Sequence, residues 1–320
     1  MMDTAGIDTA RSARWLIASQ SIRFVLRERT VTLLSMMFVM LVFISAWLGW
    51  SATETVNRIY IDAAAFLQTS GQPVPSNPVL DISPLSLMRN MSVYVALIGA
   101  LSSIVIGDRL VSLDRKAGIL LLIGVRPVSR SAYASGKITA LAVLILALGL
   151  VASCVAIATF LVLPAVTLSA VEWAQLAGFM AVTTLYTGVF GLIGLAAGAV
   201  ARSETVGLLM PVTLWLTLTF IFPQLTANLN PTATINPVSA LAVPPDTSFF
   251  HWAAQILGPL SLADAYKFAS AALLDYLPQG IASPAFLPPV ATIILATGAA
   301  ATLAWFALTR IAMTDGDYNV

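Results

Sequence analysis

The apolar stretch TVTLLSMMFVMLVFISAWLGW, residues 30–50, decides the fold class of this chain. Its 21 residues include no Asp, Glu, Lys, Arg or His, and about 20 such residues are enough to cross the hydrocarbon core of a bilayer. The apolar region of a signal peptide has only about 7–15 residues, and no small-residue cleavage site follows Trp50. The stretch therefore predicts a retained transmembrane helix.

Five further stretches have the same character, namely 87–107, 138–163, 173–200, 205–222 and 287–309. Their middles carry no ionisable side chain, and such continuous runs favour helices over the alternating segments of a membrane β-barrel. The composition agrees, with 58% apolar and 10% charged residues, where a soluble domain has about 25% charged residues. We therefore expect an all-α integral membrane protein of six transmembrane helices, five within residues 30–222 and the sixth at 287–309.

Lysines and arginines gather on one side of this arrangement. Only Arg58, Arg89 and Lys267 fall on the other side. The positive-inside rule places the basic side in the cytoplasm, so we expect a multi-pass protein of the cytoplasmic (inner) membrane with both termini, including the tail 310–320, in the cytoplasm. The basic side holds Arg11, Arg14, Arg23, Arg27, Arg29, Arg109, Arg115, Lys116, Arg126, Arg130, Lys137, Arg202 and Arg310.

The N-terminal segment 1–29 contains an amphipathic pattern over residues 10–28. Trp15 lies on its apolar face, and Arg23 and Arg27 lie on another face. Such a helix can lie in the membrane interface, with its apolar face toward lipid and its arginines at anionic headgroups.

Two outer segments connect the spans. Residues 51–86 are expected to form a loop, because Gly71–Pro78 is rich in glycine and proline. The longer outer segment, 223–286, is expected to be partly ordered, because its apolar content is too high for free exposure to water. It contains a helix candidate at 262–276, which Ser261 would begin with Asp264 three residues on.

The sequence lacks the material for several kinds of site. Its one cysteine, Cys154, and one histidine, His251, exclude an intrachain disulfide and a structural zinc site. No Ser-His-Asp or paired-carboxylate arrangement indicates an enzyme. Gly136-Lys137 is not a phosphate loop, because Ser131 stands where the first glycine should be and no Ser or Thr follows the lysine. We predict no metal, cofactor or ATP site in this chain, and no nucleic-acid partner.

The most informative cytoplasmic stretch is DRLVSLDRKAGILLLIGVRPVSR, residues 108–130. With Gly136-Lys137 it defines a loop, 108–137, that holds six of the 16 basic residues together with the apolar patch Ile119–Ile123. Such a loop suits docking onto another protein. It equally fits a basic loop that only enforces topology, and the residues alone leave both interpretations open.

This stretch resembles the coupling segment of ABC-2 type permeases, the transmembrane subunits of ATP-driven ABC transporters. In that family an acidic residue, three others and Gly-Thr-Leu precede a leucine run, a Ser-x-Pro-Val-Ser-Arg turn and a Gly-Lys. Here Asp114 replaces the usual Glu, Ile119 replaces Thr, and Gly124-Val125-Arg126 precedes the proline. The order of elements along the chain is similar as well. The resemblance implies contact with a separate ATPase at Asp114, Arg115, Gly118, Leu120, Leu121, Arg126, Pro127, Ser129, Arg130 and Lys137.

The resemblance implies an exporter in which two permease copies assemble with two cytoplasmic ATPase subunits. ATP and Mg²⁺ would bind to the ATPases, and alternating access would move a substrate of unknown chemistry outward. An outer partner protein, and an ABC assembly that transmits mechanical force to it, stay open. An ion-coupled carrier or channel is disfavoured by the clean spans, and a membrane-embedded lipid enzyme by the missing catalytic residues.

The chain also resembles, in size class, the ABC-2 permease group that serves nitrous-oxide reductase maturation. Met36, Met37 and Met40, with Cys154, would suit a soft metal. Methionine is, however, ordinary apolar filling in a membrane span.

Four glycines recur in the fourth span: Gly188, Gly191, Gly194 and Gly198. Gly194 and Gly198 form a small-xxx-small pair, which predicts a close helix approach within the subunit or at a seam between two copies. Pro211 predicts a bend in the fifth span.

Overall fold

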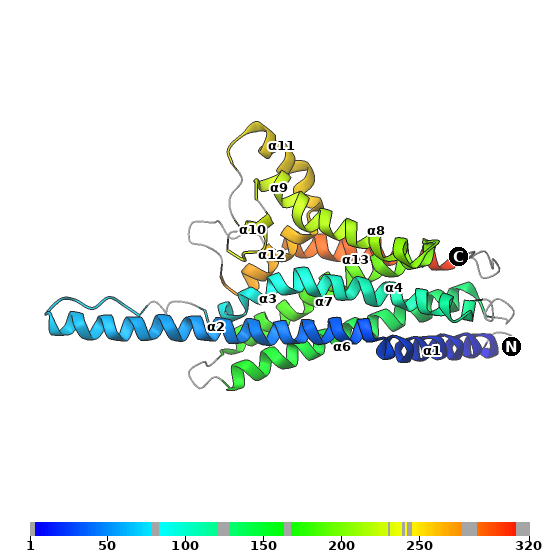
Figure 1. Ribbon diagram of the computed structural model, residues 1–320, viewed down its shortest axis with the longest axis horizontal. Helices are drawn as coiled ribbons and strands as arrows, with labels where there is room; N and C mark the ends of the chain where they lie inside the picture. Colours follow the sequence, from blue (N-terminus) through cyan, green and yellow to red (C-terminus); the bar gives the residue numbers. More distant parts are fainter. Residues whose placement is uncertain are drawn as a thin grey trace.

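The fold is a long bundle whose main helices run close to its long axis (Figure 1). Within the part that the structure describes, regular structure is helical, without strands. Six helical stretches there are long and apolar enough to cross a membrane, which confirms the prediction of an all-α membrane protein with six spans. This computed structural model describes residues 4–77, 83–120, 128–162, 168–229, 231–238, 241, 245–276 and 287–311, excepting the side chains of residues 4–12, 231 and 287.

Four of the six spans are single helices. They are α2 (Arg29–Thr69), α6 (Arg130–Val162), α7 (Ala170–Val200) and α13 (Leu287–Thr309). The second span combines the 3₁₀ turn η1 (Pro84–Met88), α3 (Arg89–Tyr94), the π-turn η2 (Val95–Gly99) and α4 (Ala100–Lys116). The fifth combines α8 (Glu204–Leu216), the π-turn η3 (Thr217–Ile221) and α9 (Phe222–Ala227), and its helix runs through Pro211.

The two π-turns lie in the second and fifth spans, and a side-chain hydrogen bond connects these spans. A π-turn shifts the helical hydrogen bonds from i+4 to i+5 and disturbs the regular pairing of backbone carbonyls. The indole Nε1 of Trp215, just before η3, donates to the carbonyl oxygen of Ala96 in η2 at 3.0 Å. This buried bond connects the second span to the fifth.

Helix α7 is the centre of the bundle and packs most closely on α4. A Cβ atom at Gly194 would collide with the backbone of Ile104, and one at Gly107 would collide with the backbone of Gly191. Gly198 lies against Asp108 in the same contact, whereas open space surrounds Gly188. Gly191, Gly194 and Gly198 of α7 therefore serve a close approach to α4 within the chain, whereas Gly188 does not.

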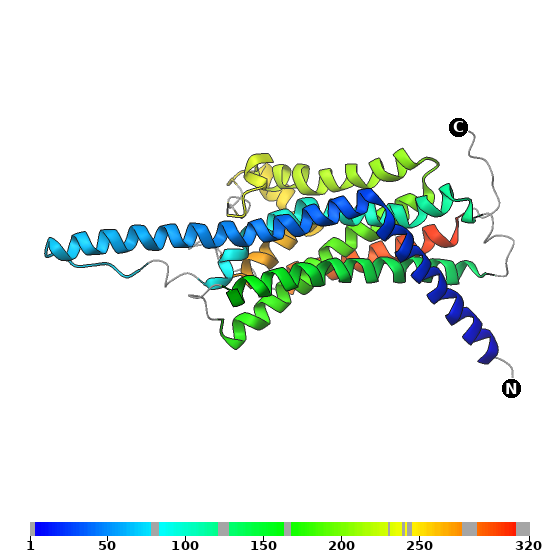
Figure 2. The ribbon, with the colours of Figure 1, turned by 60° about the horizontal axis from the view of Figure 1, so that its bottom comes forward.

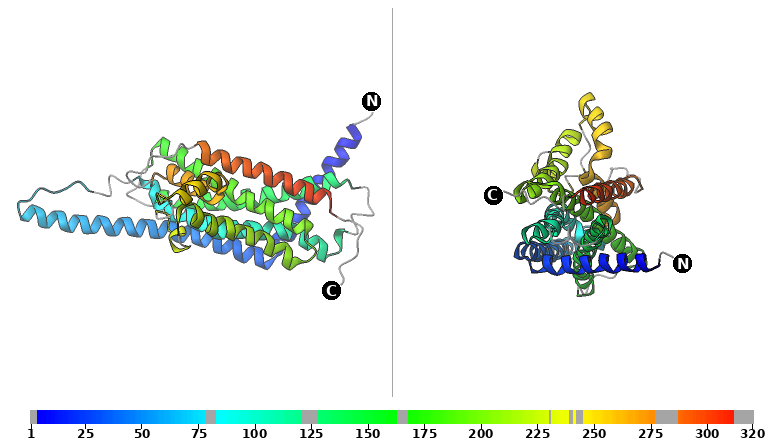
Figure 3. Two further views of the ribbon diagram at one scale, coloured as in Figure 1. Left: turned by 90° about the horizontal axis from the view of Figure 1, so that it is seen from above. Right: turned by 90° about the vertical axis from the view of Figure 1, so that its right-hand side faces the viewer.

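The two ends of the bundle differ in charge and in shape. Helix α1 (Thr4–Arg27) leaves the line of α2 at Glu28 and runs obliquely across one end (Figures 2 and 3). The last helix, α13, also ends on this side of the bundle (Figure 1). We call it the basic end, because it carries Arg14, Arg23, Arg27, Arg29, Arg109, Arg115, Lys116, Arg130, Lys137, Arg202 and Arg310.

Helix α2 is twice as long as a membrane span requires. Its 41 residues extend over about 60 Å, against about 30 Å of hydrocarbon. The expected loop over 51–86 is therefore wrong for residues 51–69, which continue the helix. Good helix formers such as Ala63, Ala64 and Leu67 follow the apolar run, and the first glycine after them is Gly71.

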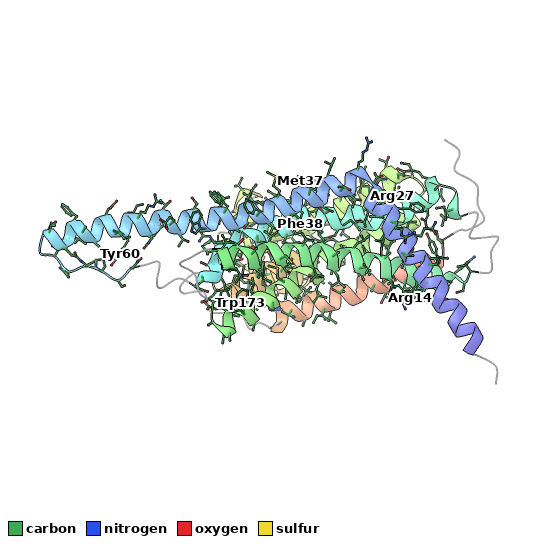
Figure 4. All side chains as sticks on the ribbon, turned by 90° about the horizontal axis from the view of Figure 1, so that it is seen from below. Arg14, Arg27, Met37, Phe38, Tyr60 and Trp173 are labelled. Atoms are coloured by element: carbon green, nitrogen blue, oxygen red, sulfur yellow. The ribbon has the colours of Figure 1, made fainter. Side chains whose placement is uncertain are left out.

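The extra turns of α2 form an arm beyond the opposite end of the bundle. Figure 4 places Tyr60 far outside the level of Trp173, which lies near that end. Gly71 turns the chain with φ 69°, and residues 72–77 run back along the helix. Tyr60 Oη donates to Pro75 O at 2.9 Å, and Asn77 Nδ2 donates to Asn57 Oδ1 at 3.0 Å. Residues 51–77 are called the projecting arm.

The outer segment was expected to be partly ordered, and its described part contains several short helices. It holds α10 (Pro231–Thr234), α11 (Ser248–Leu257), the turn η5 (Gly258–Leu260) and α12 (Leu262–Leu273). Ser261 begins α12 as predicted, and its Oγ accepts from the amide of Asp264 at 3.4 Å. Helix α12 packs into the bundle, where Tyr266 stacks on Tyr186 with ring centroids 4.3 Å apart. Helix α11 instead keeps apolar side chains exposed, namely Phe249, Trp252 and Ile256.

Candidate functional site at the basic end of the bundle

The connection between the second and third spans is shorter than expected. Helix α4 continues to Lys116 and α6 already begins at Arg130, so only residues 117–129 separate them. The prediction of a loop over 108–137 is wrong at both ends, because these residues continue the packing of their helices. Gly118, with φ 65°, follows the end of α4 in the left-handed conformation that commonly terminates a helix.

A buried ion pair joins the two helices just behind this connection. The Nζ of Lys137 on α6 lies 2.5 Å from Oδ2 of Asp114 on α4, with side-chain exposures of 0% and 7%. The ammonium also donates to Leu110 O at 2.5 Å and to Ser21 Oγ at 2.8 Å. Tyr133 Oη donates to the same Asp114 oxygen at 3.1 Å. All three donors of the ammonium are thus used, and one lysine links α1, α4 and α6.

Helix α1 packs on protein along part of the face that was expected to meet lipid. Ala18 and Val25 are buried, and a Cβ at Gly136 would collide with Ile17. Arg14 donates through Nε and Nη2 to Thr139 Oγ1 at 3.0 and 2.8 Å. The contact therefore holds α1 against α6.

The predicted surface residues of α1 remain on its outer side. Trp15 is 56% exposed, and Arg23 and Arg27 are exposed as well. Figure 4 shows Arg14 and Arg27 along this helix at the basic end.

A second charged group ties α4 to the junction of α7 and α8. Glu204 Oε2 lies 3.4 Å from Arg109 Nη1 and 2.9 Å from Lys116 Nζ. Arg115 donates to the carbonyl oxygens of Ala201 and Ala199 at 3.0 and 3.3 Å. Its guanidinium thus caps the C-terminal carbonyls of α7, where a cation is favoured.

The residues expected at the ATPase contact do not form one exposed surface. Asp114, Arg115 and Lys137 bind partners inside the bundle, and Leu120 is also buried. Ser129 and Arg130 are exposed beside the connection. Leu121, Arg126 and Pro127 lie outside the described residues.

Sequence reasoning missed Ser21, Tyr133 and Glu204. Tyr133 could have been found, since it stands four residues before Lys137 and therefore on the same helix face. Ser21 comes from a distant segment, and nothing in the pattern pairs it with Lys137.

The basic end buries one further carboxylate. Asp108 on α4 is 1% exposed and packs against Gly198 and Gly207. Its Oδ2 accepts from Ser112 Oγ at 3.4 Å. At the opposite end, Asp264 and Lys267 of α12 lie 3.9 Å apart and are largely buried. Ionisable residues are therefore buried at both ends.

Two of the three methionines singled out on the first span face an apolar groove. Met36 and Met40 line it with Leu144 and Val151, between α2 and α6, in a volume of about 560 Å³. Cys154 is exposed on α6. Among the described residues, no three His, Cys, Asp or Glu side chains come together.

The geometry of the basic end suits the transmission of movement. The connection leaves α4 after Lys116 and enters α6 at Arg130, and a buried ion pair fixes these two helices to each other. Ser21 of α1 bonds to the lysine of this pair, and Arg115 and Glu204 tie α7 and α8 to α4. Displacing this connection would carry α4 and α6 together, because separating Asp114 from Lys137 would leave a charge buried without its partner.

The family described as ABC-2 family transporter protein matches residues 15–312 of the chain. The matched range includes the six candidate spans and residues 15–27 of α1. No curated protein matches the chain significantly.

Proposed function

This chain belongs to the ABC-2 family of transporter proteins, and from that premise we propose that it is the permease subunit of an ATP-driven exporter. In this proposal the basic end faces the cytoplasm of a bacterium. Two copies form the pathway, and two separate ATPase subunits bind ATP and Mg²⁺. Their closure pushes on residues 117–129 and on α1, and the spans pass a substrate outward by alternating access.

The observation that carries this proposal is the Lys137–Asp114 pair behind the connection between α4 and α6. A loop that only enforced topology would need basic residues but no such buried bracing. Arg130 and Ser129 are exposed and available to an ATPase, while the ion pair transmits the displacement to α1, α4 and α6. Asp114, Arg115 and Lys137 then support coupling from inside the bundle.

The experiment purifies the tagged chain from its own host in mild detergent and measures ATP hydrolysis in the copurified complex. We expect a P-loop ATPase, identified by mass spectrometry, in a one-to-one ratio with the chain. Reversing two charges with Arg126→Glu and Arg130→Glu should lower both the amount of ATPase and the rate of hydrolysis. Arg202→Glu is the matched control, because it is an exposed arginine at the same end but outside the connection. A wild-type chain that brings no ATPase contradicts the proposal.

A second candidate is an ABC assembly that transmits force to an outer partner protein instead of moving a substrate. The projecting arm favours it, since a simple pathway has no need of a helix that extends about 30 Å past the membrane. Reconstituted vesicles separate the candidates, because ATP hydrolysis that depends on the outer partner and moves no solute supports force transmission.

A further inference from the structure

The projecting arm carries an uncovered apolar stripe. Val56, Ile59 and Phe66 are exposed by 43%, 64% and 71%, and the exposed Ala52 and Ala63 complete the stripe. The neighbouring face of the helix is covered, because residues 72–77 run along it and form hydrogen bonds with Tyr60 and Asn57. The chain thus covers one side of its arm and leaves the adjacent side open.

Lipid does not reach the outer part of this stripe. The apolar run of α2 ends at Trp50, so Ile59 and Phe66 stand about 13 and 24 Å further along the helix axis at 1.5 Å per residue. Glu54 and Arg58 pair with each other at 3.0 Å on the same stretch, as is usual for a helix in water. A water-exposed stripe of this kind needs a protein partner.

The spacing of the stripe identifies the partner as a helix. Residues 52, 56, 59, 63 and 66 are separated by four, three, four and three positions. This alternation has a mean period of 3.5 and is the pattern of a coiled-coil seam. Val56 and Ala63 then occupy a positions, and Ala52, Ile59 and Phe66 occupy d positions.

The charges of the arm are compatible with self-pairing. Glu54 and Arg58 fall at f and c positions, away from the seam. Asp62 is the one charged residue of 51–69 at a flanking position, and in a parallel pair it would stand opposite Leu67 of the other copy. Two identical arms therefore meet without opposing like charges.

We propose that the projecting arms of two copies of this chain pair in parallel through this stripe, outside the membrane. The inference rests on the two-copy assembly of the proposed function. A two-fold axis along the membrane normal gives both arms the same direction and the same height. It also makes the interface self-complementary, so the seam of one arm meets the seam of the other.

Disulfide trapping in native membranes tests this pairing. Cys154 is the one cysteine of the chain and is replaced by serine in the background. In that background Ile59→Cys should give, under mild oxidation, a species of twice the chain mass that reducing agent removes. A disulfide requires Cα atoms within about 7 Å, a separation that facing seam positions reach.

Ile61→Cys is the matched control. Ile61 is exposed to 55%, close to the 64% of Ile59, but it lies two residues on and points about 200° around the helix. Equal cross-linking of both variants would overturn the pairing, because it would report random collision. A cross-linked product of another mass would overturn it as well, in favour of an outer partner protein.

The mass of the detergent-solubilised wild-type assembly separates this inference from the proposed function. A complex with two copies whose Ile59→Cys variant forms no disulfide overturns the arm pairing alone. A complex with a single copy removes the two-copy assembly on which both depend.

Discussion

Replacing Lys137 by methionine tests whether the buried ion pair braces the basic end. Methionine keeps most of the length of the side chain but leaves the Asp114 carboxylate with Tyr133 as its remaining hydrogen-bond partner. Removing one partner of a buried pair costs about 3–5 kcal/mol, and we expect Lys137→Met to lower the free energy of unfolding by that amount. Replacing both residues, with Asp114→Leu and Lys137→Met, should cost far less than the sum of the two single changes.

The measurement is a titration with SDS in mixed micelles, followed by circular dichroism. A double-mutant cycle over Asp114 and Lys137 should give a coupling free energy of at least about 2 kcal/mol, since contacting residues in one network are not additive. Lys116→Met is the matched control, because Lys116 also pairs with a carboxylate, at 2.9 Å, but is 60% exposed. An exposed pair contributes about 0–1 kcal/mol, so this variant should unfold almost as the wild type does.

Two results would refute the reasoning. If Lys137→Met and Lys116→Met unfold at the same detergent fraction, the buried Asp114–Lys137 pair contributes no more to the free energy of unfolding than an exposed pair does. If the cycle is additive, the 2.5 Å contact does not connect the two helices.

Three further predictions concern the rest of the molecule. A reporter inserted at Gly71 and one fused after Val320 should lie on opposite sides of the membrane, and finding them on the same side would exclude the six-span topology. Gly194→Ala places a Cβ against the backbone of Ile104 and should lower the free energy of unfolding by about 1–3 kcal/mol in the same titration. Gly188→Ala enters open space and should leave it unchanged. Equal effects of the two variants would argue against the close α4–α7 contact. Trp215→Phe removes the donor to Ala96 O and should lower the free energy of unfolding by about 1–3 kcal/mol, because it leaves a buried carbonyl without this bond. An unchanged unfolding transition would mean that the two π-turns are not linked.

The sequence predicted the spans because membrane crossing depends on a property that is local and additive, the length of an apolar run. It did not predict where helices end, because a helix continues past the hydrocarbon wherever propensity allows. The projecting arm and the extensions to Lys116 and Arg130 are the result.

The site was predicted in part for a related reason. The pattern over 108–137 selected Asp114 and Lys137 but not their relation, which requires α4 and α6 to be placed side by side. It also assigned both residues to a surface, although an acid and a base 23 positions apart can equally pair inside a bundle. The position of Ser21 depends on how α1 turns at Glu28, and this lies beyond any local pattern.

The unbroken course of α2 makes it a lever. From its start beside α1 to the tip of the arm, the helix contains no π-turn and no proline, and it continues through its one glycine, Gly49. A tilt of about 10° around the middle of the membrane would move a tip that stands about 45 Å away by about 8 Å. A small rotation imposed at the basic end would thus produce a larger displacement of the arm on the far side of the bilayer, without any substance crossing the membrane.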